Sequence, residues 1–279
     1  MSAITTTSDG RAITPGQRLA GGFWNSTWRG TCGGEAAVIK RYRRHGAIYH
    51  VEAQALETLR VHLPLTPRVF HWDTTQLVME DKGSHQVTRW DELGRDLAHL
   101  HQIKSNSYGW DHDNFIGMRP VDQCRTADCH AYYLHQRYTP LVDDALAKGH
   151  LPPPDAERIR AATAIFKRWG GETGPCLVHG DCWPGNVIGD ADGRGVLIDP
   201  CLHAGTPYED LYNLVMWGRV PEPFWRAYQE VRPLRRGWEV ETAILQVYHL
   251  LDILCYVGRA PWLVPWIGRA LDQAERAVG

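Results

Sequence analysis

The chain has 279 residues and a formal net charge of -2 at pH 7, and 43% of its residues are hydrophobic while 22% are charged. This is an ordinary globular composition with enough apolar surface for a sizeable core, and it argues against extensive disorder. A net charge near zero creates no field that attracts polyanions, so nucleic acid and anionic membranes are disfavoured as main partners and a small molecule is favoured. At this length we expect two lobes that share a continuous core.

The N-terminal stretch and the cysteines bear on location and chemistry. The first residues contain neither the basic nor the apolar region of a signal peptide, and the longest apolar stretch, 244–257, is interrupted by His249 and Asp252. The sequence therefore predicts a cytoplasmic protein without a membrane span. Seven scattered cysteines form no CxxC pair, which predicts buried, reduced thiols and argues against a zinc site. A monomer and a dimer are both compatible with the sequence.

The first part of the chain alternates strand-like runs with a single helical segment, which predicts a small sheet-rich lobe. Gly33 and Gly34 mark a tight turn between two strands. Apolar residues in the stretch 46–63 recur with a period near 3.6, which predicts a helix with Glu52 beside its apolar stripe. The expected strands are a hairpin at 19–30 and single strands at 35–42, 68–70 and 76–80.

The sheet-like pattern stops before a charged, glycine-containing link at 79–83, and the remainder is mostly helical. We therefore expect one lobe at 1–80 and a second at 81–279. One helix is expected after the prolines at 152–154, with apolar residues that continue to Trp169. The other expected helices span 91–103, 222–230 and 239–257.

The segment CLVHGDCWPGNVIGDADGRGVLIDP, residues 176–200, carries the strongest functional signal. Two β-branched runs flank a turn rich in Gly and Asp, which predicts a hairpin over 187–198. The open ends of a hairpin lie side by side, so Asn186 before the first strand and Asp199 after the second could hold one ion. Asp181 precedes them on a loop shaped by Gly and Pro residues, and its carboxylate could point to the same place.

These side chains form a set of oxygen ligands. Such a set favours a hard cation, and one carboxylate with one amide leaves room for water and phosphate oxygens, as Mg²⁺ prefers. Phosphoryl transfer needs this combination, because metal ions neutralise phosphate charge while a carboxylate accepts the proton of the attacking hydroxyl. The spacing therefore predicts Mg²⁺-dependent phosphoryl transfer with Asp181 as the base.

The sequence HGDCWPGN at 179–186 with IDP at 198–200 resembles the Brenner-type motif of the aminoglycoside phosphotransferase superfamily, whose members share the protein-kinase fold. Within it the fructosamine (ketosamine) kinases are most similar, through HGDCWPGN itself, YGWDHDNFIG at 108–117 and LVMED at 77–81. The similarity covers nearly the whole chain. It implies a two-lobed α+β fold, in which a small antiparallel-sheet lobe binds nucleotide and a larger, mainly helical lobe carries the catalytic and substrate-binding residues.

The resemblance also implies ATP and Mg²⁺ as cofactors and assigns roles to matching residues. Asp181 corresponds to the catalytic base, and Asn186 and Asp199 correspond to the Mg²⁺ ligands. Lys40 in AAVIK corresponds to the strand lysine that contacts the ATP phosphates, and Glu52 would orient it.

Other matching positions would support the nucleotide and the catalytic loop. Asp210 in YEDL resembles the carboxylate that steadies this loop, and His179 is expected to order the loop through its backbone rather than act as a second base. The residues expected to cover the phosphates are Gly22, with its neighbour Gly21, and Ser26, and those expected to hydrogen-bond adenine through their backbone are Glu80, Asp81 and Lys82.

Five residues are candidates for the acceptor side. Trp183 and Trp217 could line an acceptor pocket and stack on a sugar or shield a cation, with core packing as the alternative. Asp111, Asp113 and Glu209 favour a cationic acceptor if they face the cleft, and otherwise form turns.

Departures from the family pattern leave the acceptor open. Cys182 stands where Leu is usual, Pro184 replaces a Gly, and the segment 201–211 differs. We expect transfer of the γ-phosphoryl group to a hydroxyl of a polar, amine-bearing acceptor, and the subgroup motifs favour a ketosamine. An antibiotic-resistance kinase acting on an aminoglycoside or a basic cyclic peptide is the alternative. An inactive kinase-like binding module ranks third, because the polar residues of the nucleotide and metal site are all present.

Overall fold

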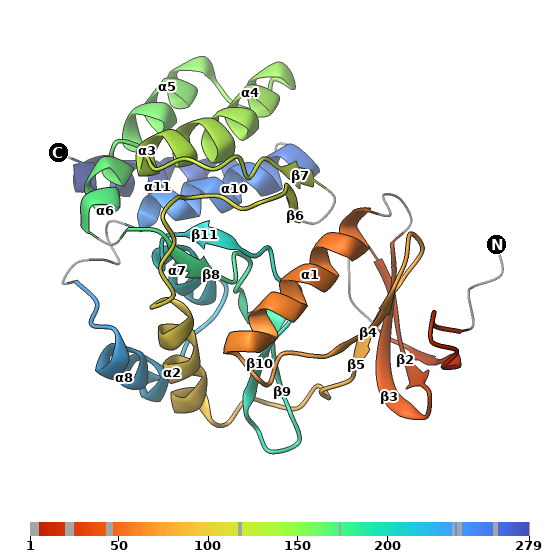
Figure 1. The fold of residues 1–279 in the computed structure, drawn as a ribbon. Helices are drawn as coiled ribbons and strands as arrows, with labels where there is room; N and C mark the ends of the chain where they lie inside the picture. The colour runs from red at the N-terminus through yellow and green to blue at the C-terminus, as the bar shows by residue number, and fades with distance from the viewer. Residues whose placement is uncertain are drawn as a thin grey trace.

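The first part of the chain builds a five-stranded antiparallel sheet in the order β1-β2-β3-β5-β4, which lies to one side of the helical part (Figure 1). The computed structural model describes residues 6–19, 25–42, 47–116, 119–172, 174–235, 238, 242–258 and 262–278. The strands are β1 (Ile13–Arg18), β2 (Asn25–Cys32), β3 (Glu35–Tyr42), β4 (Val69–Trp72) and β5 (Leu77–Glu80). Within the described residues, no helix combines the length and the hydropathy that crossing a membrane requires.

The glycine turn and the strand after it lie where the sequence predicts them. β2 and β3 pair in register along their whole length, and Gly33 and Gly34 between them have φ values of 58° and 87°. Positive φ at both central residues is what a type I′ hairpin turn needs, and glycine adopts it without strain.

The prediction is wrong for the first strand. β1 precedes the hairpin expected at 19–30, and residues 20–24 of that stretch lie outside the described part of the chain. Pro15 and Gly16 hide the strand pattern, because both residues are disfavoured inside a sheet. The pairing with β2 shifts register between Pro15 and Arg18, which an edge strand tolerates.

The helix α1 (Ala47–His62) packs across one face of the sheet. Tyr49, Ala53 and Leu56 follow helical spacing and form a cluster with Leu77 and Met79 of β5. Val38 of β3 packs against this cluster, while its neighbours on the strand belong to a second cluster, because successive side chains in a strand point to opposite faces. The sheet therefore buries both of its faces.

The remainder of the chain is mainly helical and encloses a larger core of its own. α2 packs against α8, and α10 packs against α11 (Figure 1). α3, η1 and α4 follow one another without a break, and η1 is a π-helix of 7 residues, a conformation frequent at functional sites. The helices are α2 (Trp90–Leu100), α3 (Cys129–Ala131), η1 (Tyr132–Tyr138), α4 (Thr139–Ala147), α5 (Pro153–Ala162), α6 (Ile165–Glu172), α7 (Tyr208–Met216), α8 (Glu222–Val231), α10 (Ala243–Val257) and α11 (Leu263–Val278).

Three two-stranded sheets connect the helices and carry the central motif. β8 and β11 place Val178 opposite His203, so the loop that leaves β8 and the segment that leads into α7 start at the same place. The hairpin predicted over 187–198 is confirmed by the pairing of β9 with β10. The strands are β6 (Asn114–Ile116) with β7 (Arg119–Val121), β8 (Cys176–Val178) with β11 (His203–Gly205), and β9 (Val187–Gly189), preceded by the 3-10 turn η2 (Pro184–Asn186), with β10 (Gly195–Leu197).

The predicted helices α2, α8 and α10 are present, and the single helix expected after the prolines is wrong. α5 and α6 are separate, and the hydroxyl of Thr163 donates to the carbonyl oxygen of Arg160 at 2.6 Å at the break. Such a local bond offers the backbone an alternative to a continued helix. The sequence analysis missed α7, where the acidic stretch after Pro207 resembles a turn, and also missed α11.

Candidate active site

One buried carboxylate anchors the loop at 179–186 between β8 and β9. Asp210, in the first turn of α7, accepts hydrogen bonds from the backbone amides of His179 at 2.7 Å and Gly180 at 2.8 Å, and lies 3.1 Å from Nε2 of His101. Burial acts to raise the pKa of Asp210, but the hydrogen bond and charge of His101 outweigh it and hold the pKa below its usual value. The carboxylate is therefore ionised at neutral pH and fixes the first two residues of the loop.

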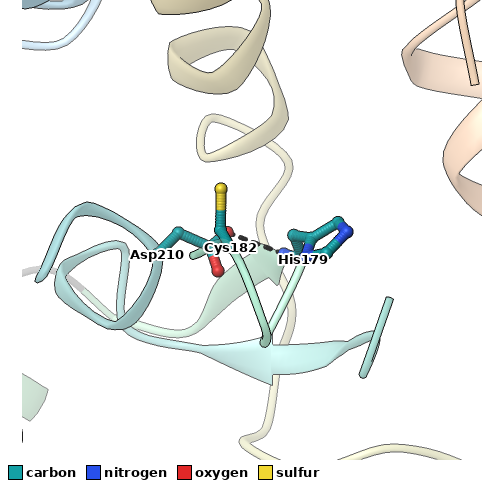
Figure 2. Close-up of side chains that lie close together, drawn as sticks. All are labelled: His179, Cys182 and Asp210. Carbon is teal, nitrogen blue, oxygen red and sulfur yellow. Dashed lines mark hydrogen bonds between the residues drawn. The ribbon is translucent and has the colours of Figure 1, made fainter. Parts of the chain in front are cut away.

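His179, Cys182 and Asp210 lie close together at the base of this loop, with their possible ligand atoms within 4.8 Å of one another (Figure 2). Nε2 of His179 lies 3.0 Å from the carbonyl oxygen of Ile198, and its Nδ1 accepts from the amide of Asp181 at 3.3 Å. Burial raises the pKa of the Cys182 thiol well above its usual range, so the sulfur is a neutral packing group. Because these atoms are engaged within the protein, the cluster orders the loop instead of offering a metal site.

Asp181 is partly buried and has a side-chain amide on each carboxylate oxygen. Nδ2 of Asn186 donates to Oδ2 at 2.9 Å, and Nδ2 of Asn213 donates to Oδ1 at 3.4 Å. Burial and the negative charge of Asp199 raise the pKa of Asp181 to about 7, and the two amides partly oppose the rise. Asn213 was not predicted, although its spacing after Asp210 places both on one face of α7 and could have revealed it.

Lys40 connects the five-stranded sheet with the β9–β10 hairpin. Its Nζ lies 2.6 Å from Oε1 of Glu52 on α1 and also pairs with the carboxylate of Asp199 after β10. Lys40 and Glu52 are both buried, so removing Lys40 would leave the buried carboxylate of Glu52 without this cation. Asp199 has φ of 56°, and within the described residues it is the one non-glycine residue with positive φ. Such strain persists only where surrounding contacts hold the residue, and it clusters at functional sites.

Asn186 and Asp199 lie at the open end of the β9–β10 hairpin, as predicted. The amide of Ile198 donates to the carbonyl oxygen of Asn186 at 3.0 Å, which brings the two positions together. The Asn186 amide nitrogen is committed to Asp181, which leaves its Oδ1 for other partners, and one oxygen of Asp199 is bonded to Lys40. The atoms that remain are oxygens, and they fit a hard divalent cation such as Mg²⁺.

The other residues predicted for the nucleotide lie along the sheet and the link after it. Ser26 lies on β2, and Gly22 lies outside the described residues. In the link, the amides of Glu80 and Asp81 donate to backbone oxygens of the sheet. The amide of Lys82 makes no hydrogen bond with the described part of the chain, so it is available to a ligand.

The two tryptophans predicted for the acceptor side are both exposed. Trp183 lies two residues after Asp181 and is 39% exposed. Its ring lies against Gly185. Trp217, at the end of α7, is 43% exposed and packs edge-on against Trp266 at 5.8 Å between ring centres. Neither ring lines the pocket that contains Gly180 and Glu209.

The two acidic residues of the 108–117 segment are engaged within their own surroundings. Asp111 pairs with Arg125 at 2.8 Å, and Asp113 accepts a hydrogen bond from the amide of Gln123 at 3.1 Å. Neither of them lines the pocket beside the catalytic loop. These contacts match the turn-forming alternative that the sequence left open.

A pocket lies beside the loop at 179–186, with Gly180 in its wall. Glu209 lines it, and burial acts to raise its pKa, but the charge and hydrogen bond of His203 outweigh burial and lower the pKa. The sequence analysis missed Arg137 of η1 and did not assign a site role to His249 of α10, which share this wall. No local motif marks either residue, because helix packing alone brings them together.

The model of the fructosamine kinase family matches residues 2–260. The chain belongs to the fructosamine kinase family. A relative in Arabidopsis thaliana named chloroplastic protein-ribulosamine 3-kinase is 27% identical over 263 residues, which are 89% of this chain and 79% of the relative. A crystal structure from Thermobifida fusca that bears the name fructosamine-3-kinase has a TM-score of 0.87 and 26% identity, and the match covers 96% of this chain and 95% of that one.

Family membership confirms the enzyme class and the fold class predicted from the sequence. This fructosamine kinase family member is a phosphotransferase with a hydroxyl group as acceptor. Its fold is the two-lobed protein-kinase-like α+β fold. The aminoglycoside phosphotransferase APH(4)-Ia, at 14% identity and a TM-score of 0.56 over 96% of this chain and 94% of its own, shares that fold alone.

Proposed function

We propose that this fructosamine kinase family member transfers the γ-phosphoryl group of ATP, in the presence of Mg²⁺, to the 3-hydroxyl of a ketosamine. The names of two similar proteins, a ribulosamine 3-kinase and a fructosamine-3-kinase, support the kind of sugar and the position. In this reaction the bond from the γ-phosphorus to the bridging oxygen of ADP breaks, a bond to the sugar oxygen forms, and the hydroxyl proton passes to a base.

The observation that carries the proposal is the convergence of Lys40, Asp181, Asn186 and Asp199 from separate elements. Lys40 reaches from β3 to Asp199, and Asn186 connects the open end of the hairpin to Asp181. A cation, two oxygen ligands for a metal and a carboxylate base therefore lie next to one another. This is the set of groups that positions and neutralises a transferred phosphoryl group.

Asp181 is placed to act as the general base. The amides of Asn186 and Asn213 bind its two oxygens and fix the direction of the carboxylate, while Asp210 holds the loop backbone. A positioned base of this kind contributes a large part of the rate only while its geometry is maintained. Asn213 and Asp210 act in this proposal as positioning residues.

Asn186 and Asp199 would hold the metal ion through their oxygens. When bound, Mg²⁺ neutralises charge on the phosphate oxygens. Lys40 supplies a further cation from the sheet, and its ion pair with Glu52 keeps it directed toward the hairpin. The amide of Lys82 is the backbone donor that we assign to adenine.

Asp181→Asn tests the proposal with ATP, Mg²⁺ and a ketosamine, measured as ADP release. We expect kcat to fall by about 10² to 10⁴, the usual contribution of a general base, with little change in the Kd of ATP. The matched control is Asp192→Asn, the same change at a carboxylate in the β9–β10 turn whose side chain is 67% exposed. Turnover near that of the wild type in Asp181→Asn would contradict the assignment.

Parallel assays with aminoglycosides and a basic cyclic peptide separate the proposal from the resistance alternative. ADP release that depends on a ketosamine supports the proposal. Release that depends on an aminoglycoside or the peptide, with none for ketosamines, shows that the acceptor is wrong. If no acceptor of either class stimulates ADP release, the proposed reaction itself is wrong.

A further inference from the structure

Arg137 of η1 is a buried cation that forms no ion pair with any carboxylate of the described residues. It is 3% exposed and lines the pocket beside Gly180. Nη2 donates to Oε1 of Gln123 at 3.2 Å and to the hydroxyl of Tyr132, and the guanidinium lies 5.0 Å from the centre of the Tyr132 ring. Nε of Arg137 is buried and has no hydrogen-bond partner within the described part of the chain.

The carboxylates around this pocket already have cationic or hydrogen-bonding partners. Glu209 lies 3.2 Å from Nε2 of His203 and also accepts from a backbone amide and a tyrosine hydroxyl. Asp252 on α10 pairs with Arg119 at 2.7 Å. Each carboxylate is therefore engaged by a nearer group, and neither forms an ion pair with Arg137, although Glu209 attracts it at longer range.

Two histidines also lie in the pocket wall. Nδ1 of His203 lies 2.8 Å from the carbonyl oxygen of Cys201, and its Nε2 lies 3.2 Å from a carboxylate oxygen of Glu209. Burial lowers the pKa of His249 to about 4, which leaves that ring neutral at pH 7. Arg137 is therefore the charge in the pocket wall that lacks an ion-pair partner among the described residues.

An arginine in this position favours an anionic ligand. The guanidinium stays protonated at any physiological pH, and a buried charge without an ion-pair partner is costly. Hydrogen bonds to the neutral oxygens of Gln123 and Tyr132 compensate only in part. Lys40, Asn186 and Asp199 do not line this pocket, so the phosphates of ATP would lie elsewhere. The anion therefore belongs to the acceptor.

We infer that Arg137 binds a carboxylate of the acceptor, so that the preferred substrates are ketosamines of free amino acids. The inference rests on the proposed function and adds the chemistry of the amine portion of the substrate. A carboxylate is the planar anion that matches the donor fork of a guanidinium.

The test compares two ketosamines of the same size, those of glycine and of glycinamide. They share the sugar, the basic nitrogen and the chain length, and they differ in the charge of the terminal group. With the wild-type protein we expect kcat/KM to be about 10-fold to 100-fold higher for the glycine ketosamine, the usual range for a hydrogen bond to a charged group. This measurement needs no variant.

Arg137→Gln removes the charge and keeps a polar side chain. We expect the kcat/KM ratio of the two ketosamines to fall toward 1 because only the glycine ketosamine loses a contact, with the KM of ATP unchanged. Arg137→Lys keeps the charge without the fork, so it should give an intermediate ratio. The matched control is Arg226→Gln on α8, whose side chain is 63% exposed, and it should leave the ratio unchanged.

Three outcomes overturn the inference. Equal kcat/KM for the two ketosamines with the wild-type protein overturns it and leaves the proposed function standing. A preference in the wild type that Arg137→Gln preserves, with both substrates losing equally, shows that Arg137 is structural. If neither ketosamine is phosphorylated, the proposed function is wrong and the inference is wrong with it. A thermal melt of each variant separates loss of folding from loss of the contact, and Arg137→Lys serves if Arg137→Gln does not fold.

Discussion

The side of the site that would bind nucleotide and the side that would bind the acceptor are built differently. On the first side, Lys40 is paired with Glu52 and Asp199, and the catalytic loop is bonded to Asp210. On the second side, the pocket wall contains Arg137, whose Nε has no hydrogen-bond partner within the described residues. The contacts for the chemical step are thus formed within the protein. On the acceptor side, the charge of Arg137 is left for the ligand to pair with.

This contrast predicts two kinds of variant. Changes on the nucleotide side should reduce turnover with every acceptor by the same factor, because all acceptors share the transferred group. Changes on the acceptor side should depend on which acceptor is used.

Lys40→Met should have the largest effect. It removes a cation that pairs with Asp199 and is proposed to contact ATP, so we expect kcat to fall by about 10² to 10³, as when one preorganised electrostatic group is lost. The loss should be the same for the ketosamines of glycine and glycinamide. Lys148→Met, which breaks an exposed ion pair with Asp144, is the control. A loss that differs between the two acceptors would contradict the separation of the two sides.

Asp210→Asn should destabilise the protein and slow turnover. The variant places an amide opposite the amides of His179 and Gly180 and the ring of His101, so at least one buried donor loses its acceptor. We expect the free energy of unfolding to fall by about 2 to 3 kcal/mol, measured by urea denaturation at pH 7. Asp143→Asn, at an exposed pair with Arg160, should change it by less than about 1 kcal/mol. Equal effects of the two variants would show that Asp210 does not anchor the loop.

The nucleotide side could be predicted from the sequence because its residues lie in short, regular patterns. The hairpin over 187–198 has two β-branched runs around a Gly and Asp turn, so its open ends, and with them Asn186 and Asp199, follow from strand pairing alone. Lys40 and Glu52 lie on a strand and a helix with clear periods, and the ion pair between them is present. Local patterns are sufficient wherever a contact is made within one supersecondary unit.

The acceptor side could not be predicted in the same way. Arg137 and His249 come from helices far apart in the chain, and only tertiary packing brings them to one wall. The π-helical geometry of η1 has no period that sequence analysis tests for. The positive φ of Asp199 is equally hidden, because aspartate rarely adopts it without surrounding contacts that hold it there.

Stability should fall as the pH is lowered, in part because of His249 in the acceptor wall. Burial lowers its pKa from 6.5 to about 4. Between these values the unfolded chain binds a proton that the folded chain does not, so the free energy of unfolding decreases as the pH falls from 6.5 toward 4. We expect His249→Gln to reduce this decrease by about 1 to 2 kcal/mol, measured by urea denaturation across the window. Burial also lowers the pKa of His101 and His179, so a residual slope remains.

The matched control for this pH dependence is His62→Gln, at the exposed end of α1. It should leave the decrease as large as in the wild type. Parallel stability curves for the wild type and His249→Gln would show that His249 takes up its proton equally in the folded and unfolded chains. The neutral state of the His249 ring in the pocket wall would then lose its support.

Asp111→Asn should have the smallest effect and sharpens the boundary of the acceptor side. The side chain of Asp111 is 75% exposed and pairs with Arg125, and an exposed pair contributes about 0 to 1 kcal/mol. A twofold change in KM corresponds to RT ln 2, about 0.4 kcal/mol, which lies within the range for an exposed pair. The KM of a ketosamine should therefore change by less than about twofold. A tenfold rise in KM for ketosamines, with unchanged KM for ATP, would instead mean that this loop contacts the basic nitrogen of the acceptor. The acceptor side would then contain an anion beside the loop as well as the cation at Arg137, and both charged groups of an amino-acid ketosamine would have a partner.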